Sequence, residues 1–334
     1  MAGADLGFTP AVRAATQPTF ERLRHVIPEA EWPFHAPLIA RINELKESRN
    51  AVILAHNYQT PEIFHGVADM VGDSLALARQ ATQCGAEVIV LAGVHFMAET
   101  AKLLNPDKTV LIPDLGAGCS LASSITGADV RALRRRHPGV PVVSYVNTSV
   151  EVKAHSDVCC TSGNAVKIVE ALGVPRVIFL PDEYLAKHVA RHTEVEIISW
   201  RGHCEVHERF TGAEIEGFRR DFAGLFVLAH PECPPDVLDA ADYVGSTQQM
   251  IDYVEERRPA RVLLVTECSM SDNVAAAHPD IDFVRPCNLC PHMKRITLEN
   301  ILASLEFLRP AVEIAPDLAE PARRAVARML ELSR

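Results

Sequence analysis

The sequence has no excess of basic residues, no long apolar run and no apolar core near its amino terminus. It has 33 Lys and Arg against 43 Asp and Glu, a formal net charge of −10, so non-specific nucleic-acid binding is not expected. The densest basic run, Arg134 to Arg136, fits a solvated helix face. No apolar stretch approaches the ~20 residues of a membrane span, and Asp5, Pro10 and Arg13 interrupt the start, where a signal peptide would have its apolar core. We therefore expect a cytoplasmic protein with neither membrane nor nucleic acid as a partner.

Three of the nine cysteines recur at a near-constant interval. Cys119, Cys204 and Cys290 each follow a short apolar strand and a turn with Gly or Pro, and the intervals are 85 and 86 residues. Such a period indicates copies of one structural unit. In a cytosolic protein, cysteines are more often metal ligands, nucleophiles or buried thiols than disulfides. If three units pack around a common axis, these three thiols meet at one point.

The rest of the chain supports three α/β units. Thr126 and Thr211 open the second and third units, each with an acidic residue three positions later, which predicts a capped helix start. Unbroken apolar runs such as 51–55 and 88–92 are typical of strands buried on both faces of a parallel sheet. We predict an α/β fold with three homologous three-layer α/β/α domains, short parallel sheets and pseudo-threefold symmetry around a central cluster and active site.

We expect the following division of the chain. A loosely structured lead-in with one helix near 18–26 covers 1–35, the three domains cover 36–122, 123–208 and 209–293, and two helices near 294–308 and 318–332 end the chain within 294–334.

Polar residues recur where the predicted strands end. His56, Asn147 and His230 follow the first strand of each unit, and Ser/Thr-rich turns follow at Ser74, Ser162 and Ser246–Thr247. In parallel α/β units, ligands bind at the carboxyl ends of the strands, and helix amino termini there attract anions. A single serine of this kind is usually only a helix cap, but three equivalent ones predict a receptor for a small, multiply anionic molecule.

Three thiolates suit either a zinc site or an iron–sulfur cluster. Zinc ligands usually come as local Cys pairs, whereas these cysteines lie far apart in the sequence. A [4Fe–4S] cluster held by three cysteines leaves one iron open as a Lewis acid. Either Cys287 or Cys290 could supply the third ligand. Cys84, Cys159, Cys160, Cys233 and Cys268 have no triplicate counterpart and are expected to be ordinary buried residues.

Candidate proton-transfer groups accompany these strand ends. They are His56 and Tyr58 in the first unit, Tyr145 in the second, and His230 and Glu232 in the third. His207 lies one helical turn after Cys204. Histidine, tyrosine and glutamate move protons in eliminations and condensations.

Several motifs carry a family resemblance over about 36–309. They are Ala55-His56-Asn57-Tyr58, Val71-Gly72-Asp73-Ser74, His95-Phe96-Met97-Ala98-Glu99, Ser144-Tyr145-Val146-Asn147-Thr148, Cys160-Thr161-Ser162-Gly163-Asn164-Ala165, His230-Pro231-Glu232-Cys233, Gly245-Ser246-Thr247 and Cys290-Pro291-His292-Met293. Together they resemble the quinolinate synthase family. The resemblance implies condensation of iminoaspartate with dihydroxyacetone phosphate to quinolinate, with loss of phosphate and two waters, for NAD biosynthesis. It also implies a carbon–carbon-forming transferase of EC class 2.5.1, with L-aspartate oxidase as a functional partner.

The resemblance also implies residue roles. Cys119, Cys204 and Cys290 would hold a [4Fe–4S] cluster, and the Cys-Pro-x-Met register favours Cys290 over Cys287. Met293 stands where some members carry a further cysteine. Proton transfer would fall to Tyr58, Tyr145 and Glu232, with His230 beside them. Substrate carboxylates or phosphate would be bound by His56, Ser74, Asn147, Ser162, His230 and Thr247, with Tyr145 and Glu232 also contacting substrate.

Two other functions stay open at this point. An aconitase-like dehydratase of another hydroxy acid could use the same open iron. The Ser/Thr-rich turns, which are suited to binding phosphate, and the two tyrosines weigh against it. A non-enzymatic iron–sulfur sensor would need a DNA- or partner-binding surface, which an acidic chain without a basic helix does not offer.

Overall fold

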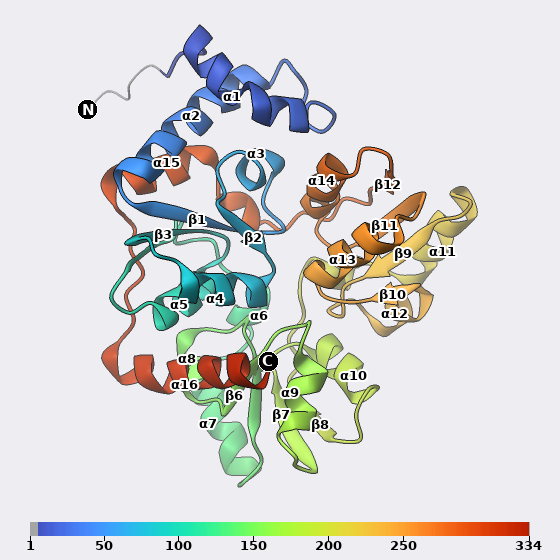
Figure 1. The fold of residues 1–334 in the computed structure, drawn as a ribbon. Coiled ribbons are helices and arrows are strands. Elements are labelled where there is room, and N and C mark those ends of the chain that lie inside the picture. Colours follow the sequence, from blue (N-terminus) through green and yellow to red (C-terminus); the bar gives the residue numbers. More distant parts are fainter. Residues whose placement is uncertain (1–5, 334) are drawn as a thin grey trace.

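The computed structural model describes residues 6–333 and shows three α/β units grouped around a common centre (Figure 1). The first unit contains β1 (Ala51–His56), α3 (Pro61–Phe64), β2 (Met70–Gly72), α4 (Ser74–Gln83), β3 (Val88–Ala92), α5 (His95–Leu104), β4 (Thr109–Leu111) and α6 (Ser120–Ser123). The second contains α7 (Gly127–Arg136), β5 (Val142–Tyr145), α8 (Val150–Ala154), β6 (Val158–Cys160), α9 (Ala165–Ala171), β7 (Arg176–Leu180), α10 (Glu183–Ala190) and β8 (Glu196–Ser199). The third contains α11 (Gly212–Asp221), β9 (Phe226–Ala229), α12 (Pro235–Ala240), β10 (Tyr243–Val244), α13 (Thr247–Arg257), β11 (Arg261–Val265), α14 (Cys268–Ala277) and β12 (Asp282–Val284).

The three sheets share one topology. Each is open, four-stranded and parallel throughout, and the orders are β2-β1-β3-β4, β6-β5-β7-β8 and β10-β9-β11-β12. The central strands are apolar and buried, as in β3, where all five residues are buried. The α/β class with three short parallel sheets is therefore confirmed. The predicted domain limits stay predictions.

One aspartate per unit fixes the first strand of its sheet. The side chains of Asp69, Asp157 and Asp242 accept hydrogen bonds from the backbone N–H groups of Ile53, Val142 and Val227 at 2.7–2.8 Å. Each aspartate also pairs with a basic side chain of the preceding helix: Lys46 at 2.8 Å, Arg134 at 2.7 Å and Arg219 at 2.9 Å. The same three-part contact thus anchors strand to helix in all three units.

The amino-terminal segment differs from the sequence-based expectation. Instead of a loose lead-in with a helix near 18–26, two helices form, α1 (Pro10–Leu23) and α2 (Trp32–Ser48). Thr9 accepts a hydrogen bond from Val12 N and caps α1, and Pro10 occupies its first position. Proline at a first helical turn has no N–H bond to lose, and its fixed φ suits the helix. Pro10 and Pro33 therefore stand in the first turns of α1 and α2, whereas Pro18 lies inside α1.

The carboxyl-terminal helices return to the first two units. After the short 3-10 helix η2 (Met293–Arg295), α15 (Leu298–Phe307) packs on α2, and α16 (Pro316–Leu332) packs on α8, β6 and α5. Buried residues of α15 and α16 join one apolar core with those of the first and second units, whereas the third unit has two smaller cores of its own. Within residues 6–333, no helix combines the length and apolarity that a membrane crossing requires.

The aspartate anchors generate a stability prediction. Asp157→Ala removes the acceptor for Val142 N and the partner of Arg134, so the free energy of unfolding should fall by about 2 kcal/mol, as for hydrogen bonds to charged groups. Urea denaturation followed by circular dichroism measures the loss. Asp280→Ala, which breaks the exposed Arg258–Asp280 pair, is the control and should change the free energy of unfolding much less, because solvent screens exposed ion pairs. Equal losses in the two variants would contradict the anchoring role.

Candidate active site

A cavity lies at the carboxyl ends of the strands. The residues to which the family motifs assign ligand, proton-transfer or substrate-binding roles all line it: His56, Tyr58, Ser74, Cys119, Tyr145, Asn147, Ser162, Cys204, His230, Glu232, Thr247 and Cys290. β1 ends at His56, β5 ends at Tyr145, and His230 directly follows β9. Parallel strands of three equivalent units thus deliver their terminal side chains to one place.

The three recurrent cysteines reach this cavity from the fourth strand of each unit. Cys119, Cys204 and Cys290 are half-buried and line the cavity, whereas Cys287 is exposed and is not among the residues that line it. Burial raises the pKa of Cys119 to about 12, and burial also raises the pKa values of Cys204 and Cys290. Thiols in this setting stay protonated unless a bound cation stabilises the thiolates.

The spacing of the donors fits a polynuclear cluster better than one zinc ion. Among residues 6–333, one trio of candidate ligand atoms lies mutually within 4.8 Å, that of Cys204, His207 and Glu232. The three cysteine sulfurs do not form such a trio, yet a tetrahedral zinc ion would hold thiolates about 3.8 Å apart. Thiolates that bind different irons of one cluster lie farther apart. The Cys204, His207 and Glu232 set has zinc-type donors, so metal analysis is part of the test below.

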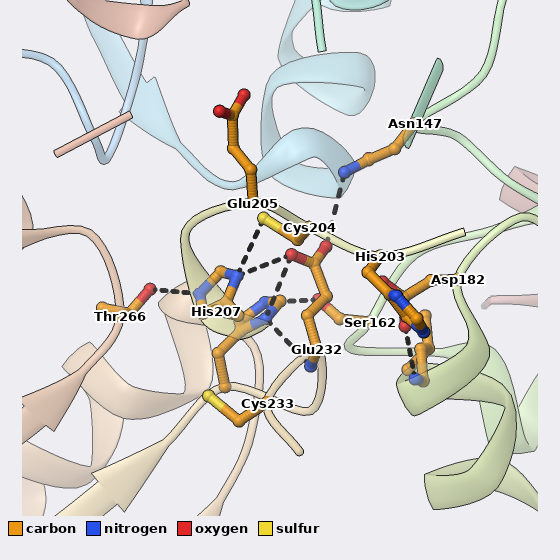
Figure 2. A network of polar contacts seen from close by, with 12 residues as sticks. Asn147, Ser162, Asp182, His203, Cys204, Glu205, His207, Glu232, Cys233 and Thr266 are labelled. Atoms are coloured by element: carbon orange, nitrogen blue, oxygen red, sulfur yellow. Dashed lines mark hydrogen bonds and ion pairs between the residues drawn. The ribbon is translucent and has the colours of Figure 1, made fainter. Parts of the chain in front are cut away.

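Glu232 is the buried carboxylate at the centre of the polar network (Figure 2). Its Oε1 accepts hydrogen bonds from Tyr145 Oη at 2.6 Å and Asn147 Nδ2 at 3.4 Å, and its Oε2 lies 2.8 Å from His207 Nδ1. Burial alone would raise the pKa of Glu232, but His230, His207 and the hydrogen bonds outweigh burial and lower it below its usual range. The carboxylate is therefore held ionised and ready to accept a proton.

His207 connects Glu232 to a threonine and a second tyrosine. His207 Nε2 lies 2.9 Å from Thr266 Oγ1, which lies 2.5 Å from Tyr58 Oη. A carboxylate only accepts, so His207 Nδ1 carries a proton and donates it to Glu232. The result is a chain of hydrogen bonds that connects Tyr58 through Thr266 and His207 to Glu232. Its last three members form a hydroxyl–imidazole–carboxylate triad, the arrangement that activates proton transfer in hydrolases.

Two histidines and two tyrosines of the cavity, His56, His230, Tyr58 and Tyr145, are neutral. Burial lowers the pKa values of His56 and His230 to about 3 and raises those of Tyr58 and Tyr145 well above their ordinary range. The imidazoles therefore donate and accept hydrogen bonds as neutral rings, and the phenols keep their protons.

Hydroxyl and amide groups on the cavity wall are available to a ligand. Asp73 caps α4 through Leu75 N and Ala76 N, so Ser74 is the first helical residue and its hydroxyl is not used as the cap. Thr247 begins α13 and accepts from Asn57 Nδ2 at 3.0 Å, and Ser162 Oγ lies 3.2 Å from His230 Nε2.

Two buried polar atoms of the wall lack partners. Asn147 Oδ1 and Thr161 Oγ1 have no hydrogen-bond partner among the described residues. Because buried polar atoms are nearly always paired, these two indicate a polar ligand.

A family model described as quinolinate synthetase A protein matches residues 40–331. The chain belongs to this family. It is 67% identical to quinolinate synthase of Agrobacterium fabrum over 94% of this chain and 91% of that protein. It is 68% identical to quinolinate synthase 2 of Mesorhizobium japonicum over 93% of this chain and 96% of that protein. Quinolinate synthase of Sinorhizobium fredii is 59% identical over 98% of this chain and 91% of its own length. The resemblance predicted from the motifs is thereby confirmed, and the chain is an enzyme of the quinolinate synthetase A family.

Two members of the network were not assigned roles from the sequence. His207 was noticed only by its spacing from Cys204. Thr266 gave no signal of its own, although it directly follows β11, at the position that Gly93 and Pro181 occupy after β3 and β7. The repeat could have pointed to this position. It could not have shown that a threonine there would reach His207.

The cysteine geometry yields the second prediction. Cys290→Ser should abolish iron binding and Cys287→Ser should preserve it, because only Cys290 of the two lies on the cavity wall. Iron and sulfide analysis of anaerobically purified variants measures this. Cys84→Ser, a buried cysteine away from the cavity, is the control and should keep the metal. A Cys287→Ser variant that loses iron while Cys290→Ser retains it would contradict the assignment.

Proposed function

We propose that this protein is a quinolinate synthase of NAD biosynthesis, condensing iminoaspartate with dihydroxyacetone phosphate and releasing phosphate and two waters. The observation that carries the proposal is the single cavity lined by every residue that the motifs assign to this reaction. Family membership over residues 40–331 supports the activity at the level of the product. The proposal places the reaction among carbon–carbon-forming transferases in the cytoplasm, with L-aspartate oxidase supplying iminoaspartate.

Cys119, Cys204 and Cys290 are the proposed ligands of a [4Fe–4S] cluster. Three protein ligands leave one iron open, and when bound the cluster supplies a Lewis acid for a substrate oxygen. The support is the shared cavity, the burial that disfavours free thiolates and the sulfur spacing. Glu267 contributes indirectly, because its Oε1 accepts from Cys290 N at 3.4 Å and pairs with Lys294 at 2.9 Å.

Substrate anions are proposed to bind to uncharged donors. His56, Ser74, Asn147, Ser162, His230 and Thr247 offer imidazole, hydroxyl and amide groups on the cavity wall. The amino ends of α4 and α13, at Ser74 and Thr247, add partial positive charge toward carboxylate or phosphate. These donors can orient two anionic substrates without a cation that would pair with Glu232.

Proton transfer is proposed to run through the hydrogen-bonded chain. Glu232, ionised and oriented by His207, removes the C–H proton of the condensed substrate. Tyr145, hydrogen-bonded to the same carboxylate at 2.6 Å, passes its phenolic proton to the departing hydroxyl and takes back the proton that Glu232 removed from carbon. Tyr58, which also lines the cavity, is the second proposed proton donor. In each elimination of water the proton removed from carbon is thus balanced by the proton delivered to the departing hydroxyl.

The direct test is an anaerobic assay for quinolinate with both substrates, on protein whose metal is counted. We expect a brown protein with about four irons and four sulfides per chain that forms quinolinate. A colourless protein with stoichiometric zinc, or a product other than quinolinate from another hydroxy acid, would contradict the proposal.

The role of Glu232 gives a further prediction. Glu232→Gln keeps the size of the side chain and one acceptor oxygen but removes the base, so turnover should fall by about 10²–10⁴-fold, the usual contribution of such a group. The cluster and substrate binding should persist, and steady-state rates with iron content measured on the same sample check this. Glu208→Gln, an exposed carboxylate that pairs with His203, is the control and should stay near the unaltered rate. Near-normal turnover by Glu232→Gln with its cluster intact would refute the role.

A further inference from the structure

Lys153 is a fully buried lysine that no step of the proposed reaction uses. It lies in α8, has no exposed surface and is among the largest fully buried side chains of the protein. Burial lowers its pKa, and neighbouring Glu99 acts in the opposite direction. An ammonium group in the interior is costly unless it is fully hydrogen-bonded, so its partners explain why it is there.

The partners of Lys153 are two backbone carbonyls that flank a residue of the cavity. Its Nζ donates to Val146 O at 2.8 Å and to Thr148 O, the residues on either side of Asn147. It also lies 5.4 Å from the ring centre of Phe96, which lines the cavity. A compact group with three donors can bind both carbonyls at once, which a neutral side chain of this length cannot do.

The segment that Lys153 binds is a tight turn with Asn147 at its apex. Thr148 N donates to Val146 O at 2.8 Å, Thr148 Oγ1 donates to Tyr145 O at 3.0 Å, and Val146 N donates to Cys160 O at 2.9 Å. Only Val146 N is held by the neighbouring strand, through Cys160 at the end of β6, and the turn itself lies beyond the end of β5. Lys153 binds the carbonyls of this turn on both sides of Asn147.

In the Asn147 amide group, the nitrogen has a hydrogen-bond partner, and the oxygen is available to a ligand. Its Nδ2 points toward Glu232 (Figure 2) and lies 3.4 Å from Oε1. Its Oδ1 is buried and has no partner among the described residues. An amide carbonyl held this way accepts a hydrogen bond from a substrate N–H or O–H only if the turn is rigid.

We infer that Lys153 is a positioning residue: by binding the carbonyls of Val146 and Thr148 it holds the Asn147 amide between Glu232 and the substrate. The inference rests on the proposed function, because Asn147 is assigned to the substrate of that reaction. Lys153 itself does not line the cavity and does not contact substrate.

A double-mutant cycle tests whether Lys153 acts through Asn147. Lys153→Met keeps the length of the chain and removes the donors. A displacement of about 1 Å of a positioned group costs about 10²-fold, so kcat/KM for quinolinate formation should fall by about that factor. In an Asn147→Ala background the same change should cost less than about 3-fold, because residues that act together are not additive. Iron content and thermal stability are measured on each variant.

Lys46→Met is the matched control. Lys46 is also a largely buried lysine that donates to a backbone carbonyl, Val67 O at 2.7 Å, but it lies away from the cavity. Its loss should leave kcat/KM within about 3-fold even if stability falls, since stability effects at a distant site do not alter transition-state binding.

The outcomes are distinct. An unaltered protein that makes no quinolinate defeats the proposed function. An active protein in which Lys153→Met costs equally in both backgrounds, or costs nothing, overturns the positioning role. If Lys153→Met does not fold, Lys153→Gln, which keeps an N–H₂ donor, takes its place in the cycle; failure of both to fold would also overturn the inference, because Lys153 would then be required for folding alone.

Discussion

The structure depends on one buried negative charge, the carboxylate of Glu232. A carboxylate in the interior is tolerated only when several donors replace its water. Here the donors come from outside the third unit: Tyr145 ends β5, Asn147 follows that strand, and His207 lies in the segment that joins the second unit to the third. Through Thr266 the same network reaches Tyr58 of the first unit. The charge is therefore satisfied only when the second and third units are docked, and the first unit joins the same network through Tyr58.

The repeat explains the scaffold, and departures from the repeat explain the chemistry. The residue that lies two positions after the third strand of each unit, β3, β7 or β11, illustrates such a departure. Val94, Asp182 and Glu267 occupy the same place and precede α5, α10 and α14. Val94 offers no polar group, Asp182 caps its helix through Leu185 N, and Glu267 pairs with Lys294 beside the Cys290 loop. A fully symmetric site could not distinguish two unlike substrates. Here the backbone positions are equivalent but their side chains differ, so the site can distinguish them.

Sequence reasoning found most of the fold and of the cavity because both follow from periodicity. The 85-residue interval located the three units, and the strand ends located His56, Asn147 and His230. Sequence reasoning failed where a single contact, which has no periodic pattern, decides the local structure. Thr9 caps α1, which begins at Pro10 and extends the helix expected near 18–26 toward the amino terminus. Thr266 was not found because its partner His207 is distant in the sequence. Lys153 was not found because its contacts with the Val146 and Thr148 carbonyls follow no spacing rule.

The contrast between Lys153 and Lys294 shows how buried cations can serve an anionic substrate without neutralising the base. Lys294 donates to Tyr58 O at 2.7 Å and to Glu267, and Lys153 donates to the backbone on either side of Asn147. Each ammonium group supports a segment that carries a cavity residue. A lysine facing Glu232 directly would form a buried ion pair and hold the carboxylate away from a substrate C–H. With both cations bound to backbone behind the wall, the cavity keeps an ionised base next to neutral donors. This arrangement suits the proposed reaction, whose substrates bring their own negative charge.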